Sequence, residues 1–181
     1  MSEPVEADAF RGTMRRVPSP VVVVTAQGEA EARGITIGSF SSVALDPPLV
    51  SFNVGRDSRM APIMEACPRF VVHVLSEEQV HLAKRFAEPG LTGPEQFEAV
   101  SFHQPEEGPP LIDHVTARLH CTPHRSMPAG DHTLYVGQVV GLDEPPNRGA
   151  VLYYKSSYRG VGSELPSTEL SPVNRVSSES S

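Results

Sequence analysis

The 181-residue chain has few cysteines, no excess of positive charge and no long apolar run. Its only cysteines are Cys67 and Cys121, so we expect no disulfide framework, which fits a reducing compartment. The formal net charge of −7 disfavours general binding to nucleic acid backbones. No apolar run approaches the length of a membrane span, and the N-terminus lacks the apolar core of a signal peptide. We therefore expect a soluble cytoplasmic protein that binds neither nucleic acid nor membranes.

Several common catalytic and nucleotide-binding motifs are also missing. The chain contains no G-x-S-x-G nucleophile elbow, no Walker loop and no G-x-G-x-x-G after a predicted strand. Nucleotide binding would therefore not use the doubly wound dinucleotide fold. His120, Cys121 and His124 invite a zinc interpretation, but on a strand Cys121 would point away from both histidines. No second cluster has matching spacing, so we expect no metal site.

Short apolar runs separated by turn residues extend along most of the chain. Val21–Thr25 is β-branched and continuous, as in a strand buried on both faces. Ser76–Gln79 matches a capping box that begins a helix running to about Ala87. The other predicted strands are Gly34–Phe40, Leu49–Val54, Phe70–Leu75, Thr116–Thr122, Thr133–Val140 and Val151–Tyr154; the other predicted helices lie within Pro4–Arg16, from Asp57 or Ser58 to Pro68, and around Pro94–Phe97.

This pattern predicts a mainly β protein, a small antiparallel barrel with a few short helices. We expect one domain at residues 10–162, after a flexible N-terminus at residues 1–9. Residues 163–181 are rich in Ser, Glu and Pro and should form a disordered tail. Residues 126–131 are expected to form a hairpin loop longer than the tightest type.

Residues Gly34–Val54 read GITIGSFSSVALDPPLVSFNV and combine strand residues with small hydroxyl residues. Ser39, Ser41 and Ser42 place three hydroxyls within four positions, with Thr36 just upstream. A strand that carries hydroxyls where it should stay apolar is a poor core strand, so this stretch predicts a ligand-binding rim. Ordinary turn chemistry before Asp-Pro is the alternative.

Two further groups of residues could bind an anion or a ligand. Arg56-Asp57-Ser58-Arg59 at a predicted helix start suits a phosphate, although a plain helix cap is the alternative. Lys84-Arg85 either complements a helix dipole or adds a second phosphate contact. Gly130-Asp131-His132 reads locally as a hairpin turn followed by a structural histidine.

The motif G-x-T-x-G-S-F-S-S-V-A-L-D-P-P-L resembles the signature of the short flavin reductase family, which is close to T-x-S-S-F-x-S-V-S-L-D-P-P-L. MRRVPSPVVVVTA, GRDSRM, FVVHVL, QVHLAKRFA, GDHTLYVG and LYYKSSYRG also fall in family order, so the resemblance covers about residues 10–159. Gly38 and Ala44 stand where the family usually has polar residues, and His73 where it usually has Asn. These departures remove possible hydrogen bonds to the flavin.

The resemblance implies an FMN-binding split β-barrel that forms a homodimer and acts as an NAD(P)H:flavin oxidoreductase. Hydride would pass from NADH or NADPH to FMN or FAD, and the reduced flavin would supply a partner monooxygenase. His132 would lie beside the flavin and nicotinamide as the catalytic residue. The implied cofactor-binding residues are Thr36, Gly38, Ser39, Phe40, Ser41, Ser42, Ser58, Arg59, Arg85 and Tyr158.

Two other functions remain open from the sequence. One is a flavin carrier or sensor without reductase turnover. The other is an enzyme with a permanently bound flavin that acts on a different small molecule, since split barrels host several redox chemistries. The sequence does not choose between FMN and FAD or between NADH and NADPH.

Overall fold

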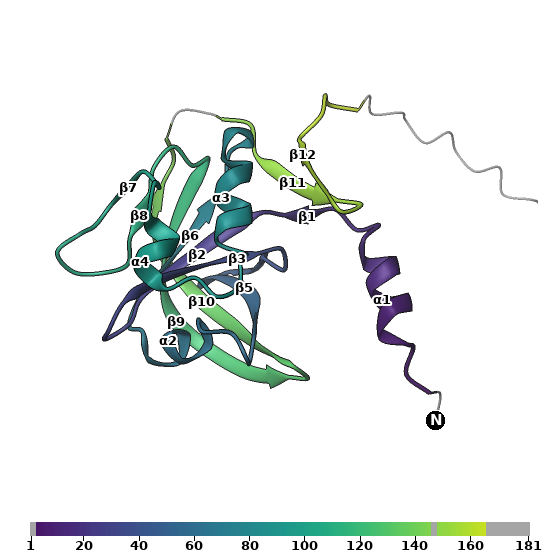
Figure 1. Cartoon of the computed structure of the whole chain (residues 1–181), viewed down its shortest axis with the longest axis horizontal. Coiled ribbons are helices and arrows are strands. Elements are labelled where there is room, and N and C mark those ends of the chain that lie inside the picture. The colour runs from purple at the N-terminus through teal and green to yellow at the C-terminus, as the bar shows by residue number, and fades with distance from the viewer. Residues whose placement is uncertain (1–2, 146–147, 166–181) are drawn as a thin grey trace, which may run out of the picture.

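The structure, a computed structural model, describes residues 3–145 and 148–165 (Figure 1). Most of the predicted tail, residues 166–181, lies outside the described residues. The main sheet contains β2 (Val22–Gln27), β3 (Ala32–Ile37), β4 (Ser41–Leu45), β5 (Pro48–Gly55), β6 (Phe70–Val74), β9 (Ala117–Ala129) and β10 (His132–Asp143). These seven strands are antiparallel and follow the order β3-β2-β6-β9-β10-β5-β4. The mainly β architecture is therefore as predicted.

Residues 3–145 and 148–165 also form two small sheets and four short helices. The strands are β1 (Ser19–Pro20), β11 (Val151–Tyr154) and β12 (Ser157–Gly160) in one sheet, and β7 (Phe102–His103) and β8 (Leu111–Ile112) in the other. The helices are α1 (Ala7–Met14), α2 (Ala61–Ala66), α3 (Val80–Arg85) and α4 (Gly93–Phe97), and a 3₁₀ turn at Glu77–Gln79 precedes α3. Within the described ranges, none of these helices has the length and apolarity that a membrane crossing needs.

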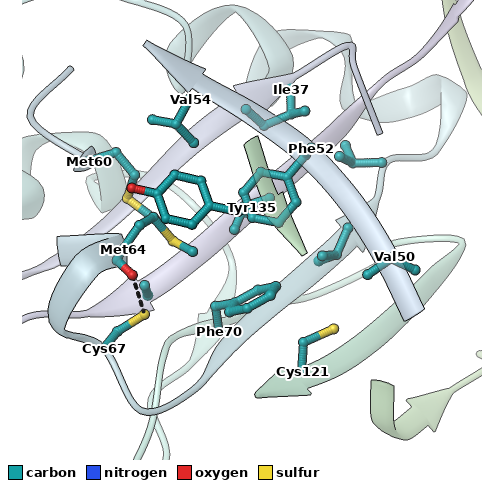
Figure 2. Packing of buried hydrophobic residues seen from close by; sticks show 14 of the residues in the cluster. Ile37, Val50, Phe52, Val54, Met60, Met64, Cys67, Phe70, Cys121 and Tyr135 are labelled. Atoms are coloured by element: carbon teal, nitrogen blue, oxygen red, sulfur yellow. Dashed lines mark hydrogen bonds between the residues drawn. The ribbon is translucent and has the colours of Figure 1, made fainter. Parts of the chain in front are cut away.

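The valine run of β2 separates two hydrophobic cores. Val22 and Val24 belong to the barrel core, which also contains Phe52, Phe70 and Tyr135. The ring centroids of Phe52 and Phe70 lie 5.4 Å apart in an edge-to-face pair, and Tyr135 stacks on Phe52 (Figure 2). The alternate valines belong to the helix-side core, made of Val21, Val23, Leu75, Leu82, Ala83, Phe86, Phe97, Val100, Ile112, Val115 and Val151. Both faces of β2 are buried, which confirms the prediction.

The helices α3 and α4 cover the free edge of β3. The buried side-chain amide of Gln96 accepts a hydrogen bond from the backbone N–H of Gly34 and donates one to its carbonyl. The N–H of Thr36 donates to the carbonyl of Phe86 at 3.2 Å. A Cβ atom at Gly34 would lie 2.5 Å from the Phe86 ring, so only glycine permits this close approach. The edge of β3 is therefore hydrogen-bonded without a neighbouring strand.

The predicted strand Gly34–Phe40 is in fact interrupted. β3 ends at Ile37, and β4 begins at Ser41 on the opposite edge of the sheet order. The reason is the turn at Asp46-Pro47, a cis bond in the structure, which pairs Leu45 with Pro48 and so folds β4 back along β5. The hydroxyl residues of this stretch are therefore separated, with Thr36 on β3, Ser39 in the segment between the strands, and Ser41 and Ser42 on β4.

The predicted long hairpin loop at residues 126–131 is wrong. β9 and β10 continue to a two-residue turn of Gly130 and Asp131, and Gly130 has a φ of +63°, which suits glycine. Pro123 and Pro128 suggested a loop, but β9 pairs with β6 only up to Cys121. Beyond that point one side of β9 is free, and prolines are tolerated on such an edge.

A strand at the C-terminal end was not predicted. β12 returns along β11 through a two-residue turn in which Lys155 and Ser156 have φ values of +49° and +60°. Such turns usually contain Gly or Asn, so this hairpin lacks its usual sequence signal. The N–H of Lys155 donates to the carbonyl of Arg15, which ties this hairpin to the segment after α1.

The helices begin and end differently from the prediction. α2 starts at Ala61, because the Ser58 hydroxyl accepts from the Met60 N–H and belongs to a turn that precedes the helix. The capping-box interaction of Gln79 with the Ser76 N–H is present, but α3 ends at Arg85. α1 starts inside the segment predicted to be flexible, has no buried residue and lies apart from the body of the protein (Figure 1).

Candidate functional site

Two adjoining hollows lie along β3. The first has a volume of about 430 Å³ and lies between β3, residues 57–60 before α2 and residues 86–90 after α3. The second has a volume of about 450 Å³ and lies between the end of β3, β5 and the β9–β10 turn. Ile35 and Thr36 line both hollows. Together the hollows form one site large enough for a nucleotide-sized ligand.

The second hollow presents a neutral hydroxyl donor. The Ser39 Oγ accepts a hydrogen bond from the backbone N–H of Asn53 at 2.9 Å. A hydroxyl that accepts in this way keeps its own O–H free to donate to a ligand. Thr36 differs, because its hydroxyl already donates to the carbonyl of Ala83 at 2.8 Å. Gly38 also lines this hollow, where its missing side chain leaves the backbone accessible.

His132 forms the opposite wall of the second hollow. Its Nδ1 lies 2.7 Å from the Oδ1 of Asp131, and its side chain is 47% exposed. This hydrogen bond holds the pKa of Asp131 below its usual value. The contact also orients the imidazole ring, and Nε2 lies beside Gly55 on β5. A Cβ atom at Gly55 would be 4.0 Å from this Nε2. His132 is therefore an oriented, accessible polar group beside the hollow.

Charged side chains of both signs line the first hollow, where Arg33 and Arg59 stand with Asp57 and Glu88. The Arg33 side chain is only 7% exposed, forms an ion pair with Glu31 and donates to the Leu91 carbonyl. Arg59 donates to the Gly90 carbonyl at 3.1 Å and lines the same hollow. Hydrogen bonds from Arg33 and from the Gly93 N–H, in that order, lower the pKa of Glu31. Two guanidinium groups in one hollow suit a phosphate.

The Ser58 hydroxyl adds a donor to this charged hollow. It accepts from the Met60 N–H at 3.1 Å, so its own O–H is available to a ligand. Arg33 was not identified from the sequence. The chain offers no local signal for it, because its role depends on how the segment at residues 88–91 folds over β3.

Several residues that the family resemblance implies for cofactor binding lie outside both hollows. Phe40 packs against the barrel core, and Ser41 on β4 donates to the carbonyl of Ser42. The Arg85 guanidinium donates to the carbonyls of Glu95 and Gln96, which fixes α3 to α4. The Tyr158 ring packs edge-to-face on Tyr153 and contacts the helix-side core. The structure therefore brings together Thr36, Gly38, Ser39, Ser58, Arg59 and His132 from that set.

His73 is a core residue and does not line either hollow. Its Nδ1 donates to the carbonyl of Val23, and its Nε2 accepts from the N–H of Ile112. Burial lowers the pKa of His73 to about 3, so the imidazole is neutral with its proton on Nδ1. The histidine joins β2 to β8 through two hydrogen bonds.

The candidate metal cluster does not converge on a common point. Within the part of the chain that the structure describes, no group of three or more His, Cys, Asp or Glu residues is placed to hold a metal ion. The His120 Nε2 lies 3.0 Å from the Oδ2 of Asp143 instead. Both cysteines are buried and free, and burial raises the pKa of Cys67 to about 11 and that of Cys121 to about 12. They stay protonated thiols at neutral pH.

Comparison with known proteins identifies the family. Residues 14–162 match the flavin reductase like domain, and the protein belongs to this family. The chain is 40% identical over 155 residues to an NADH-dependent FAD reductase of Streptomyces globisporus, an alignment that covers 82% of this chain and 85% of that protein. It is 31% identical over 166 residues to the reductase subunit of a flavin-dependent monooxygenase of Mycobacterium tuberculosis, covering 91% of this chain and 87% of that protein.

The fold agrees with this assignment. The NADH:FAD oxidoreductase of Streptomyces globisporus C-1027, solved in complex with NAD and FAD fragments, matches the structure with a TM-score of 0.80 and 36% sequence identity. The match covers 89% of this chain and 98% of that chain. The resemblance seen in the sequence and the predicted split barrel are both confirmed.

Proposed function

We propose that this protein is an NAD(P)H:flavin oxidoreductase in which the two hollows along β3 hold the flavin. The main support is that the second hollow, which presents neutral hydroxyl groups, adjoins the first hollow, which contains guanidinium groups. Ile35 and Thr36 line both hollows. A flavin nucleotide has the same division, with a neutral ring at one end and a phosphate at the other. When bound, the flavin supplies the electron sink that accepts hydride from the nicotinamide.

The residues of the site then have distinct roles in binding. The Ser39 O–H and the exposed backbone at Gly38 face the second hollow and suit the polar edge of a flavin ring. Ser58, Arg59 and the buried Arg33 suit the phosphate in the first hollow. Hydride transfer takes no proton from the protein, so these residues act by binding and orientation.

We assign His132 to the nicotinamide side of the second hollow. Its contact with Asp131 orients the ring, and its exposed position leaves room for a second ring beside it. The reduced flavin is expected to leave for a partner monooxygenase, and the similarity to a protein named as the reductase subunit of a flavin-dependent monooxygenase supports this expectation. The free, buried cysteines support a cytoplasmic location.

A homodimer is the expected assembly. α1 exposes Phe10 and Met14, and Met127 is exposed on β9 near the β9–β10 turn. Leu45 on β4 is 94% exposed. Exposed large apolar side chains are typical of surfaces that another subunit covers. Light scattering should give twice the 19.5 kDa chain mass at micromolar concentration, and a mass of one chain would contradict the dimer.

Anaerobic mixing of the protein with flavin and NADH tests the function. Loss of the absorbance of oxidised flavin at a rate that depends on protein concentration is expected. A flavin carrier or sensor would bind the flavin in titrations but leave this rate unchanged, which would overturn the proposal. Repeating the reaction with NADPH shows which nicotinamide the protein prefers.

A further inference from the structure

A third hollow continues the site beyond the charged end. It has a volume of about 460 Å³ and lies between residues 28–31, which lead into β3, and the side chains of Pro62, Ile63 and Ala66 on α2. Arg59 lines both this hollow and the first one. The three hollows are therefore joined in series, by Ile35 and Thr36 at one junction and by Arg59 at the other.

Two segments of the chain line the three hollows, and each segment passes the hollows in sequence order. On one side the lining descends from residues 35–39 in the second hollow, through 33–36 in the first, to 28–31 in the third. On the other side it ascends from Asn53 and Gly55, through residues 57–60, to Pro62, Ile63 and Ala66. Because the two walls progress together, the three adjoining hollows follow one line, which we call the β3 trough.

The third hollow differs from the first in its apolar wall and in having one guanidinium group, that of Arg59, where the first has two. Pro62, Ile63 and Ala66 give it an apolar wall, and Glu29 and Glu31 stand at its other side. The Glu31 carboxylate accepts hydrogen bonds from Arg33 and from the Gly93 N–H. Glu29 is exposed and has no hydrogen bond to another described residue. Carboxylates repel phosphate but accept hydrogen bonds from hydroxyl and amino groups. The third hollow therefore suits a neutral, aromatic, hydroxyl-bearing group.

From this geometry we propose that the β3 trough binds FAD in preference to FMN, with the adenosine half of FAD in the third hollow. This inference rests on the proposed flavin site in the first two hollows. The pyrophosphate would lie at the junction, where Arg59 faces both hollows and Arg33 lies on one side. The base would pack on Pro62 and Ile63, and the Glu29 carboxylate would accept from the ribose hydroxyls or the adenine amino group. FMN has no adenosine half, so the third hollow would stay empty when FMN is bound.

Binding titrations followed by flavin fluorescence test this assignment without relying on turnover. The wild-type protein should bind FAD about tenfold more tightly than FMN. Ala66→Gln adds a neutral side chain to the third hollow at an exposed helix position, and should weaken FAD binding about tenfold while changing FMN binding by less than about twofold. Glu29→Ala should weaken FAD binding several-fold. Glu65→Gln, on the same helix but outside the hollow, is the matched control and should change neither affinity.

The outcomes separate this inference from the proposed function. Equal affinities for FAD and FMN, or equal losses for both flavins in Ala66→Gln, would overturn the adenosine site while leaving the flavin reductase assignment intact. A rise in the KM for NADH with unchanged FAD affinity would assign the third hollow to the adenosine of the nicotinamide nucleotide and would also overturn the inference. Failure of the wild-type protein to bind either flavin would instead reject the proposed function itself.

Discussion

The backbone N–H of Asn53 donates to the Ser39 hydroxyl at 2.9 Å, and this hydrogen bond joins the segment after β3 to β5. The two strands lie far apart in the order of the main sheet, so the bond closes the sheet where it curls on itself. It also fixes the Ser39 hydroxyl as an acceptor, which leaves its single proton for a ligand in the second hollow. Closure of the barrel and ligand binding therefore share one side chain.

Ser39→Ala should weaken binding of oxidised flavin several-fold. Loss of a hydrogen bond to a neutral group costs about 0.5–1.5 kcal/mol, and the Asn53 N–H also loses its acceptor. The variant should therefore be less stable to urea by a similar amount in the absence of flavin. Ser41→Ala is the comparison, because Ser41 lies on β4 outside both hollows. Equal flavin affinities for wild type and Ser39→Ala would remove the Ser39 hydroxyl from the site.

Arg59→Gln should weaken FMN binding and spare riboflavin binding. The guanidinium is exposed, so its attraction to a phosphate is partly screened, and a loss of about five- to tenfold is expected. Riboflavin has no phosphate and should bind both proteins alike. Arg56→Gln tests whether charge alone matters, because Arg56 is exposed nearby but lines neither hollow. A parallel loss of riboflavin affinity would show that Arg59 supports the fold of residues 88–91 instead of the phosphate.

His132→Ala should slow the reduction of bound flavin by NADH and leave the affinity for oxidised flavin nearly unchanged. If the imidazole orients the nicotinamide, most of the loss should appear in kcat/KM. Stopped-flow reduction under anaerobic conditions measures this effect. Asp131→Asn should give a smaller loss in the same direction, because an amide oxygen still accepts from Nδ1. Unchanged reduction kinetics would make His132 a structural residue of the hairpin.

The buried His73 should make the protein sensitive to acid. The pKa of His73 is about 3 in the folded protein, below the usual value of 6.5, because burial disfavours the charged imidazole. Between these values the unfolded chain binds a proton that the folded chain does not. The free energy of unfolding should therefore fall as the pH is lowered from 6.5 toward 3, and His73 should have no such effect above pH 6.5.

His73→Asn tests this pH dependence. An amide side chain can both donate and accept but does not titrate, so the variant should lose less stability than wild type between about pH 6.5 and 4. Urea denaturation at several pH values gives the comparison. His124→Asn replaces an exposed histidine and should follow the wild-type curve. Parallel curves for wild type and His73→Asn would show that other groups cause the acid sensitivity.

The sequence predicts the parts of the fold that depend on neighbouring residues. The continuous β-branched run at Val21–Thr25 favours a strand buried on both faces, and β2 is such a strand. The β11–β12 turn could not be predicted, because Lys155 and Ser156 adopt positive φ values that their residue types rarely favour. The pairing of β11 with β12 and the hydrogen bond from the Lys155 N–H to the Arg15 carbonyl hold that conformation.

The same distinction holds for the candidate site. Ser39 was identified from the hydroxyl cluster and lies in the break at residues 38–40, whereas Ser41, two positions later, lies on β4. Ser58 and Arg59 were found because they are adjacent to a predicted helix start. Arg33 was missed, since its burial depends on residues about sixty positions later in the chain. Residues that act together only through tertiary contacts leave no local pattern.

The Gln96 side chain has a consequence for how the protein behaves before it meets its ligand. Its amide satisfies both backbone groups of Gly34, as a residue of an eighth strand would. An unprotected β3 would offer a template on which another chain could assemble through backbone pairing. With Gln96 in place, the wall of the trough is closed to such growth even when no flavin is bound. One glutamine thus gives the ligand-free protein protection against self-aggregation along the same strand that forms its binding surface.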